Sequence, residues 1–88
     1  MKKLRVLSLF AGIGGFDLGL ERTAGFQTVA FCEIEPFCQR VLKKHWPQVP
    51  CFDDIRLLTK NVLLESNIIC EGKEEPAKQI DVICGGFP

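Results

Sequence analysis

Apolar residues concentrate in four short, nearly continuous runs along the chain. The runs cover residues 4–10, 27–32, 49–52 and 80–84, and only the last is interrupted by an acid, Asp81. Runs of this length without strict alternation are typical of strands buried on both faces of a sheet. The pattern therefore predicts four strands, of which the third is short at best.

Between these runs, apolar residues recur at helical spacing. Residues 16–22 predict a first helix, which stops near Gly25. Pro36 suits the first turn of a second helix, because the N–H that proline lacks is not needed there, and Trp46 and Pro47 end that helix. The positions that carry the helical pattern are Phe16, Leu18 and Leu20 in the first helix, and Phe37, Val41 and Leu42, with Cys38 and His45 alongside, in the second.

A third helix is expected after the third strand. Asp53 or Asp54 is a suitable cap for it, and Ile55, Leu58 and Val62 form its apolar stripe. Residues 71–78 are charged and lack apolar periodicity, which predicts an exposed loop, and residues 85–88 turn out of the last strand.

Strands that alternate with helices predict an α/β fold with a mostly parallel sheet covered on both faces. No internal repeat interrupts this order. Four strands are few for such a fold, and the sequence ends in a loop directly after a strand, where an open sheet builds its binding crevice. We therefore expect residues 1–88 to be the N-terminal part of a larger, incomplete domain.

Composition narrows the function classes. With 88 residues, 11 basic and 11 acidic side chains and a formal net charge of zero, the chain offers no basic excess for nucleic acid. Its five cysteines include no Cys-x-x-Cys pair and stand beside a single histidine, so no metal site is expected. No apolar stretch approaches the roughly 20 residues that span a bilayer. A cytoplasmic protein with reduced thiols and no membrane partner is expected.

The first predicted strand leads into a glycine cluster, and the second ends on an acid. Gly12 and Gly14 leave room where the backbone bends and where a ligand approaches it. Glu33 follows Gly12 by 33 − 12 = 21 residues, close to the roughly 20 at which dinucleotide folds place a ribose-binding carboxylate. This combination predicts a cofactor that contains a nucleoside. The alternative is a glycine turn without a ligand and a solvated Glu33.

The residue at the third glycine position separates two cofactor classes. A nicotinamide cofactor carries a pyrophosphate, which favours a third glycine three residues after the second. Asp17 stands there instead, and its negative charge would lie close to the phosphates. S-adenosyl-L-methionine has no phosphate and carries a cationic sulfonium, so Asp17 favours this methyl donor. A NAD-binding oxidoreductase fragment is the alternative.

Several segments resemble the motifs of the DNA cytosine-5 methyltransferases. Residues 8–16 (SLFAGIGGF) resemble the family's opening motif, and residues 86–88 (GFP) resemble the start of its catalytic Pro-Cys motif. Between them, residues 33–35 and 54–55 stand in the right order for two further cofactor motifs. The resemblance runs over nearly the whole chain and implies a Rossmann-like methyltransferase fold that binds S-adenosylmethionine.

The resemblance also implies a role for individual residues. Phe10 would stack near the adenine, and the backbone of residues 11–15 would hold the methionine part. Glu33 would bind the ribose hydroxyls, and Ile34, where the family often has tryptophan, would pack against the adenine. Asp54 would accept a hydrogen bond from the adenine amino group, unless it serves only as a helix cap. The cofactor-binding residues expected in full are Phe10, Ala11, Gly12, Ile13, Gly14, Gly15, Glu33, Ile34, Asp54 and Ile55.

The resemblance gives no catalytic residue within the chain. The family's cysteine nucleophile directly follows the proline that corresponds to Pro88. Cys84, in or at the end of a strand, is expected to pack as a small hydrophobe, and so are Cys32 and Cys38. We therefore expect the chain alone to be inactive and to lack the DNA target-recognition domain.

The family implies methyl transfer to C5 of cytosine in double-stranded DNA, within a restriction–modification system. DNA would be contacted through downstream parts. A different class of function is one half of a split methyltransferase, completed by a C-terminal chain, or a non-enzymatic remnant. An unfinished sheet would leave a strand edge and apolar side chains uncovered, so poor solubility in isolation is expected.

Overall fold

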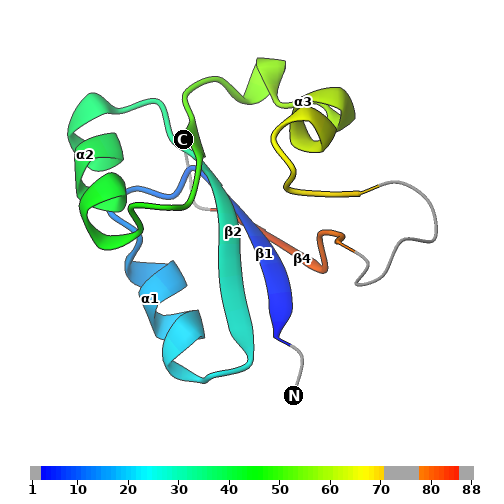
Figure 1. Cartoon of the computed structure of the whole chain (residues 1–88). Helices are drawn as coiled ribbons and strands as arrows, with labels where there is room; N and C mark the ends of the chain where they lie inside the picture. The colour runs from blue at the N-terminus through cyan, green and yellow to red at the C-terminus, as the bar shows by residue number, and fades with distance from the viewer. Residues whose placement is uncertain (1–2, 71–77, 86–88) are drawn as a thin grey trace.

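The computed structural model describes residues 3–70 and 78–85 of the protein. In that part of the chain, strands and helices alternate as the sequence predicts (Figure 1). The elements in order are β1 (Leu4–Leu9), α1 (Gly15–Arg22), β2 (Phe26–Cys32), α2 (Pro36–His45), β3 (Cys51–Phe52), the 3-10 helix η1 (Ile55–Leu57), α3 (Lys60–Glu65) and β4 (Val82–Gly85).

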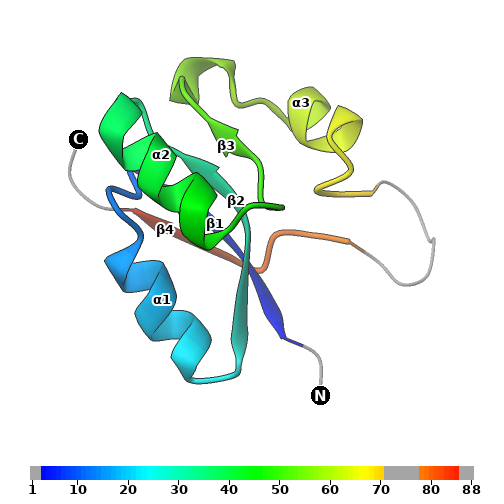
Figure 2. The same ribbon diagram turned by 60° about the vertical axis from the view of Figure 1, so that its left-hand side comes forward.

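The four strands form one parallel sheet in the order β3-β2-β1-β4. Helices α1 and α2 cover one face of the sheet, and α3 lies on the other face (Figure 1 and Figure 2). The chain builds outward from β1 through β2 to β3 and then crosses back, so that β4 pairs with the free side of β1. The predicted α/β fold with a covered parallel sheet is therefore confirmed.

An irregularity in the pairing of β1 and β2 distributes side chains between the two faces. Val6 pairs with Thr28 but Leu7 pairs with Ala30, so Val29 is the extra residue of a bulge. Val29 and Ala30 both pack in the cluster around Leu7. The bulge thus gives the α3 face two successive side chains from β2.

The apolar core on the α3 face joins the sheet to the last helix. Leu7 and Ala30 of the sheet pack with Leu63 and Ile68, and all four side chains are buried. Ile68 and Leu63 also close the end of α3, because the N–H of Ile68 donates to the carbonyl of Leu63 (3.0 Å). On the opposite face, the ring of Phe31 meets that of Trp46 edge-on at a centroid distance of 5.1 Å.

Several predicted strand boundaries differ from the structure by one or more residues. The first strand ends at Leu9 rather than at residue 10, because Phe10 has a positive φ of 51° that no strand accommodates. The third strand shortens to Cys51–Phe52. The last strand begins at Val82 rather than at residue 80, and Ile80 packs against the core cluster from the preceding loop.

The prediction of one continuous third helix was wrong. The chain forms the short helix η1, turns at Leu58 with a ψ of 85°, and starts α3 afresh with Thr59 as its cap. The hydroxyl of Thr59 accepts from the N–H of Val62 at 3.3 Å. Leu63, rather than Val62, is the buried residue of α3. The cap formed by Thr59 therefore starts a new helix within the segment for which the apolar stripe predicted a single one.

The apolar patterns of α1 and α2 overstate what these helices bury. In α2 only Leu42 is buried, while Phe37 and His45 are exposed, so the apolar pattern does not mark the buried positions of this helix. In α1 the buried side chain is Asp17, and Phe16 and Leu18 are exposed. The expected loop over residues 71–78 and the turn over residues 85–88 lie largely outside the described residues.

Gly14 sets how closely α2 approaches the turn after β1. Its φ is +83°, and a Cβ built on it would lie 2.7 Å from Cζ3 of Trp46 and 2.9 Å from Cδ2 of Leu42. By contrast, a Cβ on Gly12 or Gly15 would meet nothing within 4 Å. The lack of a side chain at Gly14 thus allows the turn to pack closely against α2.

Replacement of this glycine should destabilise the fold. We expect Gly14→Ala to lower the free energy of unfolding by about 2–4 kcal/mol, since a left-handed backbone penalty adds to overpacking against Trp46 and Leu42. Gly15→Ala, one residue further at a helical position in open space, is the matched control and should change stability by less than about 1 kcal/mol. Urea unfolding measures both variants, and equal losses would contradict the packing role of Gly14.

Candidate functional site

The carboxyl ends of the parallel strands meet at one edge of the sheet, and the predicted site residues lie there. Strands β2 and β3 lie on one side of β1 and β4 lies on the other, so the order of the strands reverses between β1 and β4. Open α/β sheets bind ligands in the crevice outside the carboxyl ends at such a switch point. The fold itself therefore marks this edge as the candidate site.

The turn after β1 has a left-handed backbone at several positions. Phe10, Gly12 and Gly14 have φ values of 51°, 58° and 83°. The N–H of Gly14 closes the turn by donating to the carbonyl of Ala11 at 3.0 Å. A positive φ is unfavourable for Phe10 because of its side chain, and backbone strain of this kind concentrates at binding sites.

Glu33 joins the end of β2 to this turn. Oε1 of Glu33 accepts from the N–H of Gly12 (2.7 Å), and Oε2 accepts from the N–H of Glu35 (2.8 Å). Only 9% of the Glu33 surface is exposed, so the carboxylate is held in place by two backbone donors at the edge of the sheet. The alternative of a solvated Glu33 is therefore wrong.

A hollow of about 210 Å³ opens beside Glu33 and gathers several of the predicted residues. Its walls come from the ends of β1 and β2 and from the segment after β3. The lining residues are Phe10, Cys32, Glu33, Ile34, Asp53, Asp54, Ile55 and Arg56. The structure thus brings together five residues that the sequence analysis assigned to one ligand, and they come from three separate segments.

Asp54 caps the helix η1 and is paired with Arg56 on the rim of this hollow. Its Oδ1 accepts from the backbone N–H of Arg56 (2.9 Å) and from Nε of the same residue (3.0 Å), while Oδ2 accepts from Nη2 (2.8 Å). These hydrogen bonds hold the pKa of Asp54 below its ordinary value. The helix-cap role considered for Asp54 is confirmed, and Asp53 is exposed.

A second hollow, of about 280 Å³, lies at the switch point between β1 and β4. Phe10 lines both hollows. The other lining residues of the second hollow are Ser8, Leu9, Ala11, Phe16, Asp17, Cys84 and Gly85. Ile13 is exposed and lines neither hollow. A Cβ built on Gly12 would meet nothing within 4 Å, so the backbone of the turn is open to a ligand there.

Asp17 lines the second hollow, and its carboxyl is buried and hydrogen-bonded within the fold. Its side chain accepts from the hydroxyls of Ser8 (3.0 Å) and Thr28 (3.3 Å), and the residue is 1% exposed. Burial raises its pKa, and the two hydroxyl hydrogen bonds partly offset this. The Asp17 carboxyl thus ties α1 to β1 and β2, a structural role that the sequence analysis did not predict.

Four of the described cysteines do not have the environment of a nucleophile. All five are unpaired. Burial raises the thiol pKa of Cys32, Cys38, Cys51 and Cys84, whereas reactive thiols need a lowered one. Cys84 is half-buried rather than fully buried, and the Ser8 side chain hydrogen-bonds to it.

Within residues 3–70 and 78–85, no three His, Cys, Asp or Glu side chains gather as metal ligands would. No helix in this part is long and apolar enough to cross a bilayer.

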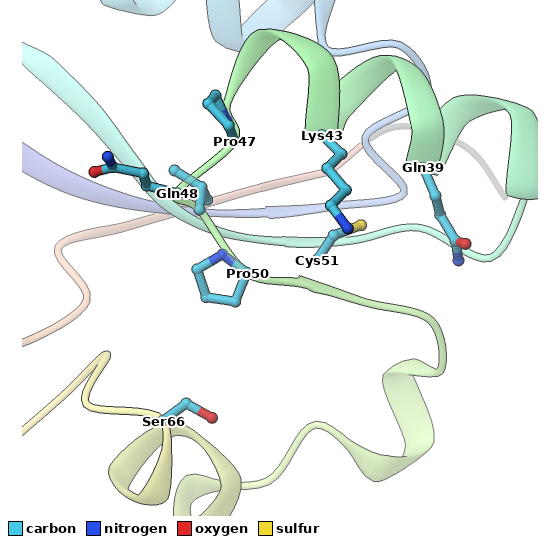
Figure 3. Close-up of a pocket in the computed structure, with 8 residues that line it drawn as sticks. Gln39, Lys43, Pro47, Gln48, Pro50, Cys51 and Ser66 are labelled. Carbon is cyan, nitrogen blue, oxygen red and sulfur yellow. The ribbon is translucent and has the colours of Figure 1, made fainter.

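A larger hollow lies away from the carboxyl edge and contains none of the predicted residues (Figure 3). Its volume is about 570 Å³, and it is lined from α2, the loop that follows it, β3 and the end of α3. The lining residues are Gln39, Lys43, Pro47, Gln48, Val49, Pro50, Cys51 and Ser66. We place the candidate site at the smaller hollows, because strand ends, strained backbone and a fixed carboxylate converge there.

Two functional features escaped the sequence analysis. Arg56 was not considered, although its position two residues after a capping aspartate is a local signal for an ion pair. The second is the buried hydrogen bonding of Asp17, whose partners Ser8 and Thr28 lie 9 positions before it and 11 positions after it in the sequence. Their proximity depends on how α1 packs on the sheet, and no short-range pattern reports that packing.

Comparison with known proteins identifies the family. The sequence model of the C-5 cytosine-specific DNA methylases matches residues 4–88. The chain belongs to the C-5 cytosine-specific DNA methylase family. The resemblance in the motifs is thereby confirmed, and family membership favours a methyl donor over the nicotinamide alternative.

Similar proteins include several type II methyltransferases that are much longer than this chain. M2.BsuMI of Bacillus subtilis is 38% identical over 85 residues, which cover 97% of this chain and 18% of that protein. M.AquIA of Picosynechococcus sp. is 36% identical, with coverages of 96% and 32%. M.CviJI of a Paramecium bursaria Chlorella virus is also 36% identical, with coverages of 96% and 19%. The chain thus spans about a fifth to a third of these relatives.

Among solved structures, a crystal structure of a DNMT2 mutant from Spodoptera frugiperda matches the fold. Its TM-score is 0.68 at 22% sequence identity, and the match covers 94% of this chain and 22% of that one. The likeness supports the α/β architecture independently of the sequence motifs.

The buried Asp17 makes stability depend on pH. Its folded pKa lies above the value of about 3.9 expected in the unfolded chain, so the stability it contributes is full below about pH 4 and is lost as pH rises through the folded pKa. Asp17→Asn removes this titration. We expect the free energy of unfolding of the variant, relative to the wild type, to rise between pH 4.5 and pH 7.

Urea unfolding at both pH values measures this difference. Asp53→Asn, at an exposed carboxyl on the same edge of the sheet, is the control and should show no such trend. A difference for Asp17→Asn that stays constant or falls as pH rises would count against a carboxyl whose proton is held by burial.

Proposed function

We propose that residues 1–88 form the N-terminal part of the cofactor-binding domain of a DNA cytosine-5 methyltransferase and that they seat S-adenosyl-L-methionine. The observation that carries the proposal is the position of Glu33. Its carboxylate is fixed to the glycine turn by a 2.7 Å hydrogen bond, in a hollow that also holds Phe10, Ile34, Asp54 and Ile55. A nucleoside needs these groups: an acid for its sugar, apolar walls for its base and a polar group at the edge of the base.

The hydrogen bonds of Glu33 match a ribose. A carboxylate has about four acceptor sites, two on each oxygen. Each oxygen of Glu33 accepts one backbone N–H, from Gly12 or from Glu35, which leaves one site on each oxygen. Two neighbouring acceptor sites suit the two neighbouring hydroxyls of a ribose.

The remaining predicted residues suit the other parts of the cofactor. Ile34 is 73% exposed beside Glu33, so its side chain is available to cover a base. Phe10 lines both hollows, which supports a position between adenine and the methionine part. The methionine part would follow the backbone of residues 11–15, where Gly12 adds no side chain to hinder it. Bound there, the cofactor supplies an electrophilic methyl group.

The activity we propose for the whole protein is methyl transfer to C5 of cytosine in double-stranded DNA. Family membership supports this reaction, and relatives named type II methyltransferases support a restriction–modification role in the cytoplasm. DNA recognition and the nucleophile are assigned to parts that correspond to the remaining length of those relatives. A complementing C-terminal chain is the form that a split enzyme would take.

Glu33 gives the first test of the cofactor proposal. We expect Glu33→Gln to weaken binding of S-adenosylhomocysteine by roughly tenfold or more, because hydrogen bonds to a charged acceptor are stronger than those to an amide. Glu35→Gln, two residues further in an exposed cap position, is the control and should bind as the wild type does. Isothermal titration calorimetry measures both variants, and tighter wild-type binding of NAD than of S-adenosylhomocysteine would overturn the proposal.

The 88-residue chain should transfer no methyl group by itself. Burial raises the thiol pKa of Cys32, Cys38, Cys51 and Cys84, so none of these four supplies a thiolate near neutral pH. Incorporation of labelled methyl groups into double-stranded DNA measures activity. Co-expression with a chain that carries the downstream motifs of a relative should give activity, whereas methylation by the 88 residues alone would contradict the assignment.

A further inference from the structure

We propose that Arg56 sets the base selectivity of the cofactor site, by fixing Asp54 as an acceptor for one exocyclic amino group. The inference rests on the proposed function and assigns a role to a residue that neither the family motifs nor the sequence analysis singled out. Arg56 and Asp54 both line the hollow that holds Glu33, at the beginning of η1.

The guanidinium of Arg56 determines which acceptor site of Asp54 remains open. Oδ1 accepts two donors, the backbone N–H of Arg56 at 2.9 Å and its Nε at 3.0 Å. Oδ2 accepts one, Nη2 at 2.8 Å. Of about four acceptor sites on a carboxylate, one therefore remains, and it lies on Oδ2. Oδ2 of Asp54 can therefore accept one hydrogen bond from one donor group of a ligand.

This arrangement distinguishes purines by the group at their 6-position. Adenine carries an amino group there and donates a hydrogen bond to Oδ2. Hypoxanthine carries a carbonyl oxygen, which would place one acceptor against another and leave both without a donor. Arg56 cannot turn to donate to that oxygen while its fork is engaged with Asp54, because both of its contacts to the carboxylate come from one planar group.

The ion pair between Arg56 and Asp54 contributes little to the stability of the fold. The Arg56 side chain is 85% exposed and that of Asp54 is 23% exposed, and exposed pairs add little to folding. The backbone N–H of Arg56 caps η1 on Asp54 without the guanidinium. Loss of the Arg56 side chain therefore leaves the cap in place but frees the carboxylate to rotate, so Arg56 acts as a positioning residue.

The test compares two ligands that differ only at the 6-position, S-adenosylhomocysteine and S-inosylhomocysteine. We expect the wild type to prefer the adenosine form by roughly tenfold or more. Arg56→Ala should weaken binding of the adenosine form by roughly three- to tenfold, as an unrestrained side chain must be ordered on binding, and should change the inosine form little. The preference should fall by the same factor.

Three further variants separate positioning from general damage. Arg56→Lys retains the charge without the fork and should recover only part of the preference. Arg40→Ala removes an arginine that lies over the Phe37 ring on α2, outside the hollow, and should change nothing. In an Asp54→Ala background, Arg56→Ala should have no further effect on the preference, because Arg56 acts through Asp54.

Each outcome decides the proposal. Equal weakening of both ligands by Arg56→Ala, or an effect that persists in the Asp54→Ala background, overturns the role of Arg56 while the cofactor site stands. Glu33→Gln should weaken both ligands alike, because the ribose is common to them. If a folded wild type binds neither ligand, the proposed function fails and the role of Arg56 fails with it.

Discussion

The hydrogen bond between Glu33 and the N–H of Gly12 is the contact on which the candidate site depends. It crosses from the end of β2 to the turn after β1 and closes the edge of the sheet at 2.7 Å. A carboxylate this buried is unfavourable unless donors surround it, and the N–H groups of Gly12 and Glu35 satisfy that need. The same two donors fix the direction of the acid. The requirement for burial and the requirement for ligand recognition are therefore met by one arrangement.

The turn after β1 divides its glycines between folding and binding. Gly14 lies against Trp46 and Leu42, where no side chain fits, and so sets the distance between the turn and α2. Gly12 faces open space and keeps the backbone accessible. Below the turn, the contact of Asp17 with Ser8 and Thr28 secures α1 to the sheet. A rigid frame of this kind supports binding, because it lowers the entropy that a ligand would otherwise have to remove.

The sequence motifs and the strand order point to the same candidate site by independent routes. The motif residues come from the sequence alone, whereas the switch point in the strand order depends only on hydrogen-bond pairing. Both lie at the carboxyl edge of the sheet. The contribution of the third strand is the least regular: Asp54 and Ile55 follow a strand of two residues, and the orientation of Asp54 comes from Arg56 rather than from the sheet.

The sequence by itself determined the order of strands and helices, the glycine turn and the acid at the end of β2. These follow from short-range features, namely apolar runs, glycines and the proline at the start of α2, which act within a few residues. Tertiary structure alone decided that Asp17 is buried and that Phe37 is exposed. Which side chain faces the core depends on the partner element, and a polar residue is buried wherever distant hydroxyls satisfy it. Such partners are set by packing, which local sequence does not encode.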